Sequence, residues 1–267
     1  MKTVDILIFG GQSNMQGQSE CLSENEIVPR ALEYRYLSDS LIPLRNPVGE
    51  NVHCDGTRGD EVTPATDVVT WLSNHALGAA CYGHTNLVPA FCRAYAETAD
   101  RDVIAVHAAK GSTCVAQWLP GGAGYKVLRD KACAASTRAR EGGCEIGRIY
   151  FVWLQGESDA LMSTSTATYK AQLNTLWEAL HADVGVDAFG IIRVGRFAGD
   201  ARDDEILRAQ DEICREQADF WMLTEIAVEL NRQPEYMNPT VAGHYSAKGL
   251  EMLGRVAGEA LAKAAKG

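Results

Sequence analysis

The chain has 267 residues, of which 46% are hydrophobic and 22% are charged, so it has the composition of an ordinary globular protein rather than a disordered one. Its formal net charge of -10 disfavours nucleic acid and anionic membranes as partners, because both are bound largely through clustered lysine and arginine. No apolar run approaches the roughly 18 residues that a membrane-spanning helix requires. A neutral substrate fits this composition better.

The N-terminus and the cysteines give an expectation about the compartment. Met1 to Thr3 lead directly into an apolar stretch without a separate signal-peptide core and cleavage site, which predicts a cytoplasmic protein, or an exported one whose leader has been removed. The eight cysteines include no C-x-x-C pair, so they form neither a zinc ribbon nor a thioredoxin motif. They are expected to be free thiols in a reducing compartment, with disulfides in an exported protein as the alternative.

The first predicted element is a buried strand over residues 4–9, which stops at Gly10-Gly11 and is followed by Ser13. Buried parallel strands deliver ligands and catalytic groups at their carboxyl ends. The glycine pair allows a sharp turn there, and Gly17 allows a close backbone approach just beyond. A displayed nucleophile and a plain polar turn are both compatible with this stretch, because Met15 replaces the second glycine of the α/β-hydrolase G-x-S-x-G motif.

After this turn, short apolar runs alternate with segments of helical periodicity. Strands are predicted over 31–37, 102–107, 147–154, 188–194 and 220–225, and helices over 86–99, 125–140, 168–184, 202–217 and 247–263. This alternation indicates a parallel, doubly wound sheet with helices on both faces. No linker or repeat divides the chain, so one α/β/α domain over 1–267 is expected, with a loop-rich insertion at about 38–85 where the periodicity disappears.

The histidines differ in their expected roles. Three of them lie in the insertion without acidic or cysteine partners at ligand intervals, and they are expected to be solvated or structural rather than metal ligands: His53, His75 and His84. His107 lies within a predicted strand and is expected to be a core residue. His244 lies in a loop before the last helix, where it can project over the carboxyl edge of the sheet. A helix-capping turn is the alternative interpretation of that loop.

Four sequence blocks lie where the strands end or the last helix begins. They are Gly11-Gln12-Ser13-Asn14-Met15-x-Gly17, Gly111-Ser112-Thr113 followed by Trp118, Trp153-Leu154-Gln155-Gly156-Glu157-Ser158-Asp159, and His244-Tyr245-Ser246-x-x-Gly249. In this order and placement they resemble the SGNH (GDSL-like) hydrolase superfamily, and within it the sialate O-acetylesterase and acetylxylan esterase group of carbohydrate esterases. The resemblance covers most of the chain outside the insertion.

The resemblance implies a three-layer α/β/α fold with a five-stranded parallel, flavodoxin-like sheet. It also implies that Ser13 is the nucleophile and His244 the general base. The implied oxyanion donors are the backbone N–H groups of Ser13 and Gly111 and the side-chain amide of Gln155. No cofactor or metal is expected, since no phosphate loop, dinucleotide fingerprint or metal-ligand cluster is present.

One position departs from the pattern of the group. Relatives often place an acidic residue three positions before the histidine, where this chain has Val241. An imidazole that accepts the Ser13 proton needs an acceptor at its other N–H, preferably an anion. Glu157 is the leading candidate for this third catalytic residue, and a carboxylate that braces loops through backbone N–H groups is the alternative. Asp159 is expected to cap the segment that follows it.

The expected substrate contacts come from Gln12 and Asn14 beside the serine and from Trp118. The tryptophan is expected to form an apolar wall for a sugar ring, with a buried core residue as the alternative. The resulting prediction is a serine esterase that removes O-acetyl groups from an acetylated carbohydrate through an acetyl-enzyme. A weak or inactive carbohydrate-binding protein and an esterase or thioesterase for another acyl group remain alternatives, and the sugar and the oligomeric state stay open.

Overall fold

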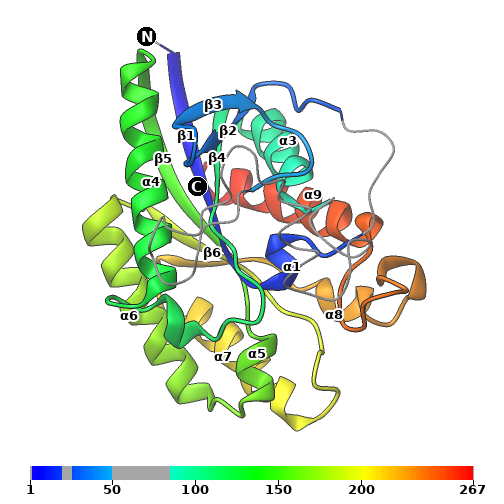
Figure 1. Cartoon of the computed structure of the whole chain (residues 1–267). Coiled ribbons are helices and arrows are strands. Elements are labelled where there is room, and N and C mark those ends of the chain that lie inside the picture. Colours follow the sequence, from blue (N-terminus) through cyan, green and yellow to red (C-terminus); the bar gives the residue numbers. More distant parts are fainter. Residues whose placement is uncertain (1, 20–25, 50–84, 267) are drawn as a thin grey trace.

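The computed structural model of the protein describes residues 2–19, 26–49 and 85–266 (Figure 1). Its centre is a seven-stranded sheet with the order β3-β2-β4-β1-β5-β6-β7. The strands are β1 (Lys2–Gly11), β2 (Ala31–Arg35), β3 (Ser40–Pro43), β4 (Asp102–His107), β5 (Cys144–Leu154), β6 (Ala188–Ile192) and β7 (Phe220–Thr224). Every pairing is parallel except the antiparallel hairpin of β2 and β3.

The central strand β1 is apolar on both faces because helices cover both sides of the sheet. From Val4 to Gly11 every residue is buried. Asp5 is the one charged residue in this run, and its carboxylate accepts hydrogen bonds from the Tyr95 hydroxyl at 2.8 Å and from the backbone N–H of Arg148 at 2.9 Å. The register against β5 shifts at this point, so a buried charge is satisfied at an irregularity of the ladder.

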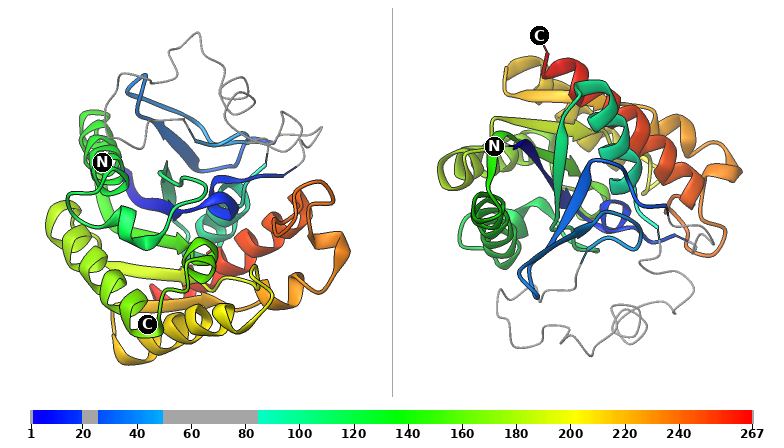
Figure 2. Two further views of the ribbon diagram at one scale, coloured as in Figure 1. Left: turned by 60° about the horizontal axis from the view of Figure 1, so that its bottom comes forward. Right: turned by 90° about the horizontal axis from the view of Figure 1, so that it is seen from above.

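Five long helices form the outer layers. Helices α3 (Val88–Ala99) and α9 (Ala247–Ala264) cover one face of the sheet, and α4 (Ala123–Glu141), α6 (Thr166–Val184) and α7 (Ala201–Glu216) cover the other (Figures 1 and 2). Helix α9 carries Gly254 and Gly258 where a Cβ would collide with the backbone of Leu87 and Phe91. These two glycines therefore allow α3 and α9 to pack closely.

The predicted helices and the fold class are confirmed, and the strand count is corrected. Each of the five long helices begins and ends within two residues of its predicted bounds. The strands β4-β1-β5-β6-β7 have the expected flavodoxin-like order. The expected number of five strands is wrong for the whole sheet, because β2 extends the β4 edge and β3 pairs with it. Strand β3 was not predicted, since it is short, half-buried and ends at Pro43, as edge strands do.

The remaining expectations concern the predicted insertion, the cysteines and membrane-spanning helices. Strand β3 lies at the start of the predicted insertion, whereas residues 50–84, with His53, His75 and His84, lie outside the described residues. Five cysteines are described, and all are free thiols: Cys92, Cys114, Cys133, Cys144 and Cys214. Among the described helices, none is long and apolar enough to cross a membrane.

Candidate active site

The turn after β1 places Ser13 at the carboxyl edge of the sheet. Gly11 still belongs to β1, with φ of 141°, and a Cβ there would collide with the backbone of Leu154 on β5. Ser13 opens the single-turn helix α1 (Ser13–Gln16), and Gly17 ends it with φ of 91° against Asn86. The glycines therefore let the serine turn lie directly on its neighbours, as the sequence predicted for Gly17.

The structure brings Ser13 and His244 together from opposite ends of the chain. The Nε2 atom of His244 lies 2.9 Å from the Oγ atom of Ser13, and its Nδ1 atom lies 2.9 Å from the carbonyl oxygen of Ala242. Because a carbonyl oxygen only accepts, Nδ1 carries the ring proton and the lone pair of Nε2 faces the serine hydroxyl. This is the tautomer that a general base for Ser13 requires.

The loop that carries His244 is closed on itself. The side-chain oxygen of Asn238 accepts hydrogen bonds from the backbone N–H groups of Thr240 and Val241, at 2.9 and 3.2 Å. The backbone N–H of Asn238 donates to the His244 carbonyl at 2.8 Å, and the His244 N–H donates to the Val241 carbonyl at 3.2 Å. These bonds hold the Ala242 carbonyl at a fixed position beside the imidazole.

Burial lowers the pKa of His244 below its ordinary value, and hydrogen bonds with the backbone of Ala242 and Val241 oppose that shift only in part. The imidazole is therefore neutral near pH 7 and can accept a proton. Val241 itself is buried and stands where relatives often have an acid. The electrostatic partner of the ring is a peptide dipole, which carries a partial charge instead of the full charge of a carboxylate.

Glu157 does not occupy the expected place behind the histidine. It opens the short helix α5 (Glu157–Leu161), is buried, and accepts a 2.8 Å hydrogen bond from Asn14 Nδ2. The acceptor at His244 Nδ1 is the Ala242 carbonyl, which the sequence could not indicate because the bond depends on the shape of one loop. Burial raises the pKa of the Glu157 carboxyl, and the hydrogen bond from Asn14 opposes this shift.

Asp159 lies where the sequence placed it, away from the histidine. Its carboxylate accepts hydrogen bonds from the Thr164 hydroxyl at 3.0 Å and from the backbone N–H of Val115 at 2.9 Å. The first bond secures the turn after α5. The second holds the start of the short helix η2 (Val115–Trp118), which follows the Gly111-Ser112-Thr113 loop.

Two of the three expected oxyanion donors lie beside the nucleophile. A Cβ on Gly111 would stand 3.5 Å from the Cβ of Ser13, so the Gly111 backbone is next to the serine. The Gly111 N–H donates a 2.7 Å hydrogen bond to the side-chain oxygen of Gln16. The Ser13 N–H has no acceptor among the described residues. An ester carbonyl bound here would therefore find the Ser13 N–H available as a donor, whereas the Gly111 N–H is bonded to Gln16.

The third expected donor, Gln155, is contradicted by its contacts. Its side chain is 0% exposed, and Nε2 lies 2.6 Å from the Asp159 carboxylate, 2.8 Å from the Thr113 carbonyl and 3.2 Å from Gln12 Oε1. Both amide hydrogens are therefore used inside the protein. Gln12 also accepts a 3.1 Å bond from the backbone N–H of Ser158, so it joins loops and is not placed to bind substrate.

The aromatic wall expected from Trp118 is also contradicted. Its side chain is 1% exposed, its Nε1 donates to the Thr113 hydroxyl at 3.0 Å, and its ring packs edge-on against Trp153 at 5.7 Å. It is a core residue, which was the alternative interpretation. Asn14 is buried as well, and its hydrogen-bond partners are the Glu157 carboxylate and backbone groups of the histidine loop.

The aromatic ring beside the histidine belongs to Phe197, which the sequence did not single out. The two rings lie at 86° with centroids 6.0 Å apart, and the Phe197 ring is half-buried. The Asp203 carboxylate fixes this loop by accepting hydrogen bonds from three successive backbone N–H groups, those of Phe197, Ala198 and Gly199, at 2.7 to 3.1 Å. The only signal in the sequence is the position of this loop directly after a predicted strand.

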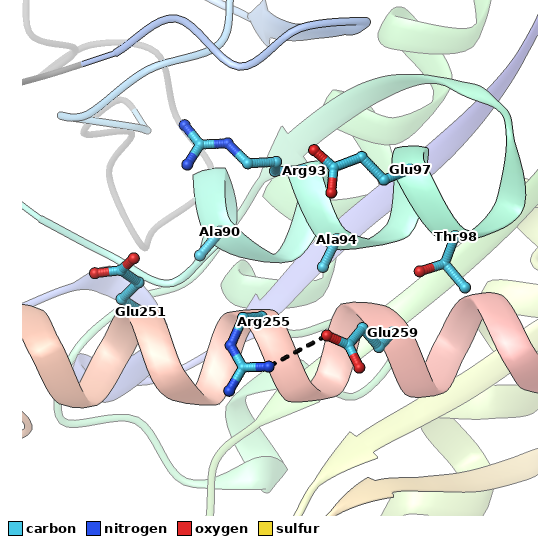
Figure 3. A pocket seen from close by; sticks show the side chains of 8 residues that line it. All are labelled: Ala90, Arg93, Ala94, Glu97, Thr98, Glu251, Arg255 and Glu259. Atoms are coloured by element: carbon cyan, nitrogen blue, oxygen red, sulfur yellow. Dashed lines mark hydrogen bonds and ion pairs between the residues drawn. The ribbon is translucent and has the colours of Figure 1, made fainter.

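A hollow lies on the surface between α3 and α9, away from Ser13 (Figure 3). It has a volume of about 130 Å³ and is lined by charged side chains of both signs, with Arg93 and Glu97 on α3 and Arg255 paired to Glu259 on α9. It contains none of the residues around Ser13. Within the described ranges, no group of three His, Cys, Asp or Glu residues could hold a metal ion.

One family model and several solved structures match this chain. The family model described as carbohydrate esterase, sialic acid-specific acetylesterase matches residues 3–263. No curated protein sequence matches the chain. Among solved structures, a protein from Arabidopsis thaliana has a TM-score of 0.63 at 17% identity, and the alignment covers 96% of each chain.

Two further structures share the fold. A carbohydrate acetylesterase from Xanthomonas citri has a TM-score of 0.53 at 15% identity over 98% of this chain and 55% of that chain. The lipase Lip_vut3 from a goat rumen metagenome has a TM-score of 0.53 at 12% identity over 99% of both chains. At these identities the likeness concerns the fold, whereas the family model spans nearly the whole sequence. The chain belongs to the carbohydrate esterase family of sialic acid-specific acetylesterases.

Proposed function

We propose that this protein is a serine esterase that removes an O-acetyl group from a carbohydrate through an acetyl-enzyme intermediate. The observation that carries the proposal is the 2.9 Å contact between Ser13 Oγ and His244 Nε2, with the ring proton held on Nδ1 by the Ala242 carbonyl. Membership of a carbohydrate esterase family supports the same chemistry. The structural relative from Xanthomonas citri is a carbohydrate acetylesterase, which supports the acetyl group and the sugar as the substrate.

In the first half-reaction, Ser13 Oγ attacks the acetyl carbonyl carbon while His244 Nε2 accepts the hydroxyl proton. The carbonyl π electrons move to oxygen, and the resulting oxyanion lies near the backbone N–H groups of Ser13 and Gly111. Collapse of this intermediate breaks the bond to the sugar oxygen, which takes the proton from Nε2. The acetyl group is then an ester of Ser13.

In the second half-reaction, water attacks the acetyl-enzyme while Nε2 accepts one of its protons. The second tetrahedral intermediate collapses, the proton on Nε2 returns to Ser13 Oγ, and acetic acid leaves and ionises to acetate in solvent. In both intermediates the ring is an imidazolium whose Nδ1–H points at the Ala242 carbonyl. A peptide dipole stabilises this charge less than a carboxylate would, so a modest turnover is expected.

Substrate binding requires a change at Gly111. The acceptor of its N–H is Gln16 Oε1, at 2.7 Å. The acetyl carbonyl oxygen is proposed to replace this side-chain oxygen as the acceptor. Gln16 is partly exposed, so its side chain can turn toward solvent without disturbing the core.

The proposal is tested with an activated aryl acetate and the intact protein. Ser13→Ala and His244→Ala should each lower turnover by at least about 10³-fold. Mass spectrometry should find one added acetyl group on the wild-type protein and none on Ser13→Ala. Full activity of Ser13→Ala would contradict the assignment.

The substrate class is tested with O-acetylated sialic acids, acetylated xylan and simple acetyl sugars in parallel with aryl esters of longer acyl chains. Release of acetate from one sugar class with high preference supports the carbohydrate esterase. Preference for longer acyl chains would indicate a different ester substrate. Sugar binding without acylation of Ser13 would indicate a binding protein that keeps the fold.

A further inference from the structure

One buried side chain holds both peptide groups that flank His244. Asn14 directly follows the nucleophile, and its Oδ1 accepts a 3.3 Å hydrogen bond from the backbone N–H of Tyr245. Its Nδ2 lies 3.4 Å from the carbonyl oxygen of Gly243. The residue before the histidine thus offers its carbonyl, and the residue after it offers its N–H, to the two ends of the same amide.

An amide is suited to this position because it has an acceptor and a donor on one rigid plane. Asn14 lies in the first turn of α1, one residue after Ser13. Asn14 therefore joins the histidine loop directly to the turn that carries the nucleophile, and Asn238 Nδ2 adds a second link by donating to the Gln18 carbonyl at 2.8 Å, beyond α1. The bonds that Asn238 Oδ1 and the Val241 carbonyl accept shape the loop itself, whereas Asn14 connects the loop to α1 next to Ser13.

Glu157 decides which way this amide points. Its Oε1 atom lies 2.8 Å from Asn14 Nδ2, and both side chains are buried. A flipped amide would place its oxygen against the carboxylate and its NH₂ group against the Tyr245 N–H, so two contacts would become repulsive. The orientation that satisfies Glu157 is the one that satisfies both peptide groups beside His244.

We propose that Glu157 is a positioning residue that acts through Asn14, whose oriented amide holds His244 at its working distance from Ser13. This inference rests on the proposed function, because it concerns the geometry of the same reaction. Glu157 contributes an acceptor oxygen at Asn14 and not a charge at the imidazole. A misplacement of a catalytic group by about 1 Å can cost about 10²-fold in rate, so the effect should appear in kcat.

The test is a double-mutant cycle on kcat for an activated aryl acetate. Glu157→Leu and Asn14→Leu should each lower kcat by about 10- to 100-fold and change KM by less than about 3-fold. The double variant should be no slower than Asn14→Leu alone, because the two residues act in series. If the two losses multiply in the double variant, Glu157 acts independently of Asn14 and the inference fails.

A conservative variant separates the acceptor from the charge. Glu157→Gln keeps an oxygen that can accept from Asn14 Nδ2, and it should recover most of the kcat that Glu157→Leu loses. Failure of this rescue would mean that the negative charge itself is required, which contradicts the proposal. If Asn14→Leu does not fold, Asn14→Ala replaces it in the cycle, since the smaller side chain admits water to the Glu157 carboxylate.

Two controls distinguish the possible failures. Asp5→Asn changes another buried carboxylate, one held by Tyr95 on the strand that leads to Ser13. It should lower the melting temperature and leave kcat unchanged, which shows what a structural loss looks like. Ser13→Ala reports on the proposed function itself: if it abolishes turnover while Glu157→Leu keeps the wild-type kcat, only the positioning inference is wrong.

Discussion

The carbonyl oxygen of Ala242 lies 2.9 Å from Nδ1 of His244, at the place where a carboxylate would orient a catalytic histidine. A carboxylate there would raise the pKa of the ring, whereas burial lowers it here. Two residues of one loop, and not two distant parts of the chain, therefore fix the tautomer of the base.

The first prediction concerns pH. His244 must be neutral to accept the Ser13 proton, so activity is lost as the ring becomes protonated on lowering the pH. Because burial lowers its pKa, the acid limb of kcat/KM should fall below the ordinary value of about 6.5 for histidine. The pH profile of aryl acetate hydrolysis at low substrate concentration measures this limb. A limb above about 6.5 would indicate that an anion faces the ring.

The second prediction concerns Gln16, whose side-chain oxygen accepts from the Gly111 N–H. Gln16→Ala removes this competing acceptor and should raise kcat/KM by about 2- to 10-fold, since one hydrogen bond contributes about 0.5–1.5 kcal/mol. Gln16→Glu places an anion at the same donor and should lower kcat/KM, because a charged acceptor binds more tightly and repels the oxyanion. Steady-state kinetics of both variants give the comparison. A loss of activity in Gln16→Ala would show that Gln16 assists the reaction.

The third prediction concerns the buried His107, whose Nε2 lies 3.2 Å from the carbonyl oxygen of Met15 in α1. Burial, with a smaller contribution from Lys131, lowers its pKa to about 3. The unfolded chain binds a proton at this residue below about pH 6.5, whereas the native protein does not. The free energy of unfolding should therefore fall by up to about 1.4 kcal/mol per pH unit as the pH drops from about 6.5 toward 3.

Urea denaturation of the wild type and of His107→Gln at pH 7, 6 and 5 tests this prediction. The glutamine can still donate to Met15 but does not titrate, so the free energy of unfolding of the variant should depend less steeply on pH. If the free energies of unfolding of the two proteins depend equally on pH, His107 binds its proton equally well in the native and the unfolded protein, and the prediction is wrong.

The fourth prediction compares two aromatic residues, Trp118, which the sequence singles out, and Phe197, which only the structure places beside His244. Trp118→Ala should lower the free energy of unfolding by about 3–5 kcal/mol, as truncations of buried aromatic residues do, and should not raise KM selectively. Phe197→Ala removes a half-buried ring and should cost about 1 kcal/mol of stability or less, but it should lower kcat by at least about 5-fold because the ring packs on His244. Thermal unfolding and kinetics of both variants check this. If Trp118→Ala does not fold, Trp118→Phe provides the same comparison.

The arrangement of the chain was predictable from local patterns. Periodicity and short apolar runs located the five long helices and the strands of the flavodoxin-like core, because burial on one or both faces leaves a repeat in the sequence. Strand β3 has no such repeat, since it lies half-exposed at the sheet edge. The positions of Ser13 and His244 beside predicted elements made them candidates, and the resemblance of the four sequence blocks to the SGNH superfamily implied their roles.

The partners of the side chains at that edge were decided only by the tertiary structure. The contact of Asn14 with Glu157 joins residues 143 positions apart, and Gln155 turns inward to Asp159 and Thr113 instead of toward Ser13. A hydrogen bond requires its atoms to be within about 3.5 Å, and the positions of several loops set that distance together. The sequence by itself determined the fold class, the nucleophile candidate and the histidine candidate. The three-dimensional packing of the loops decided what stands behind the histidine.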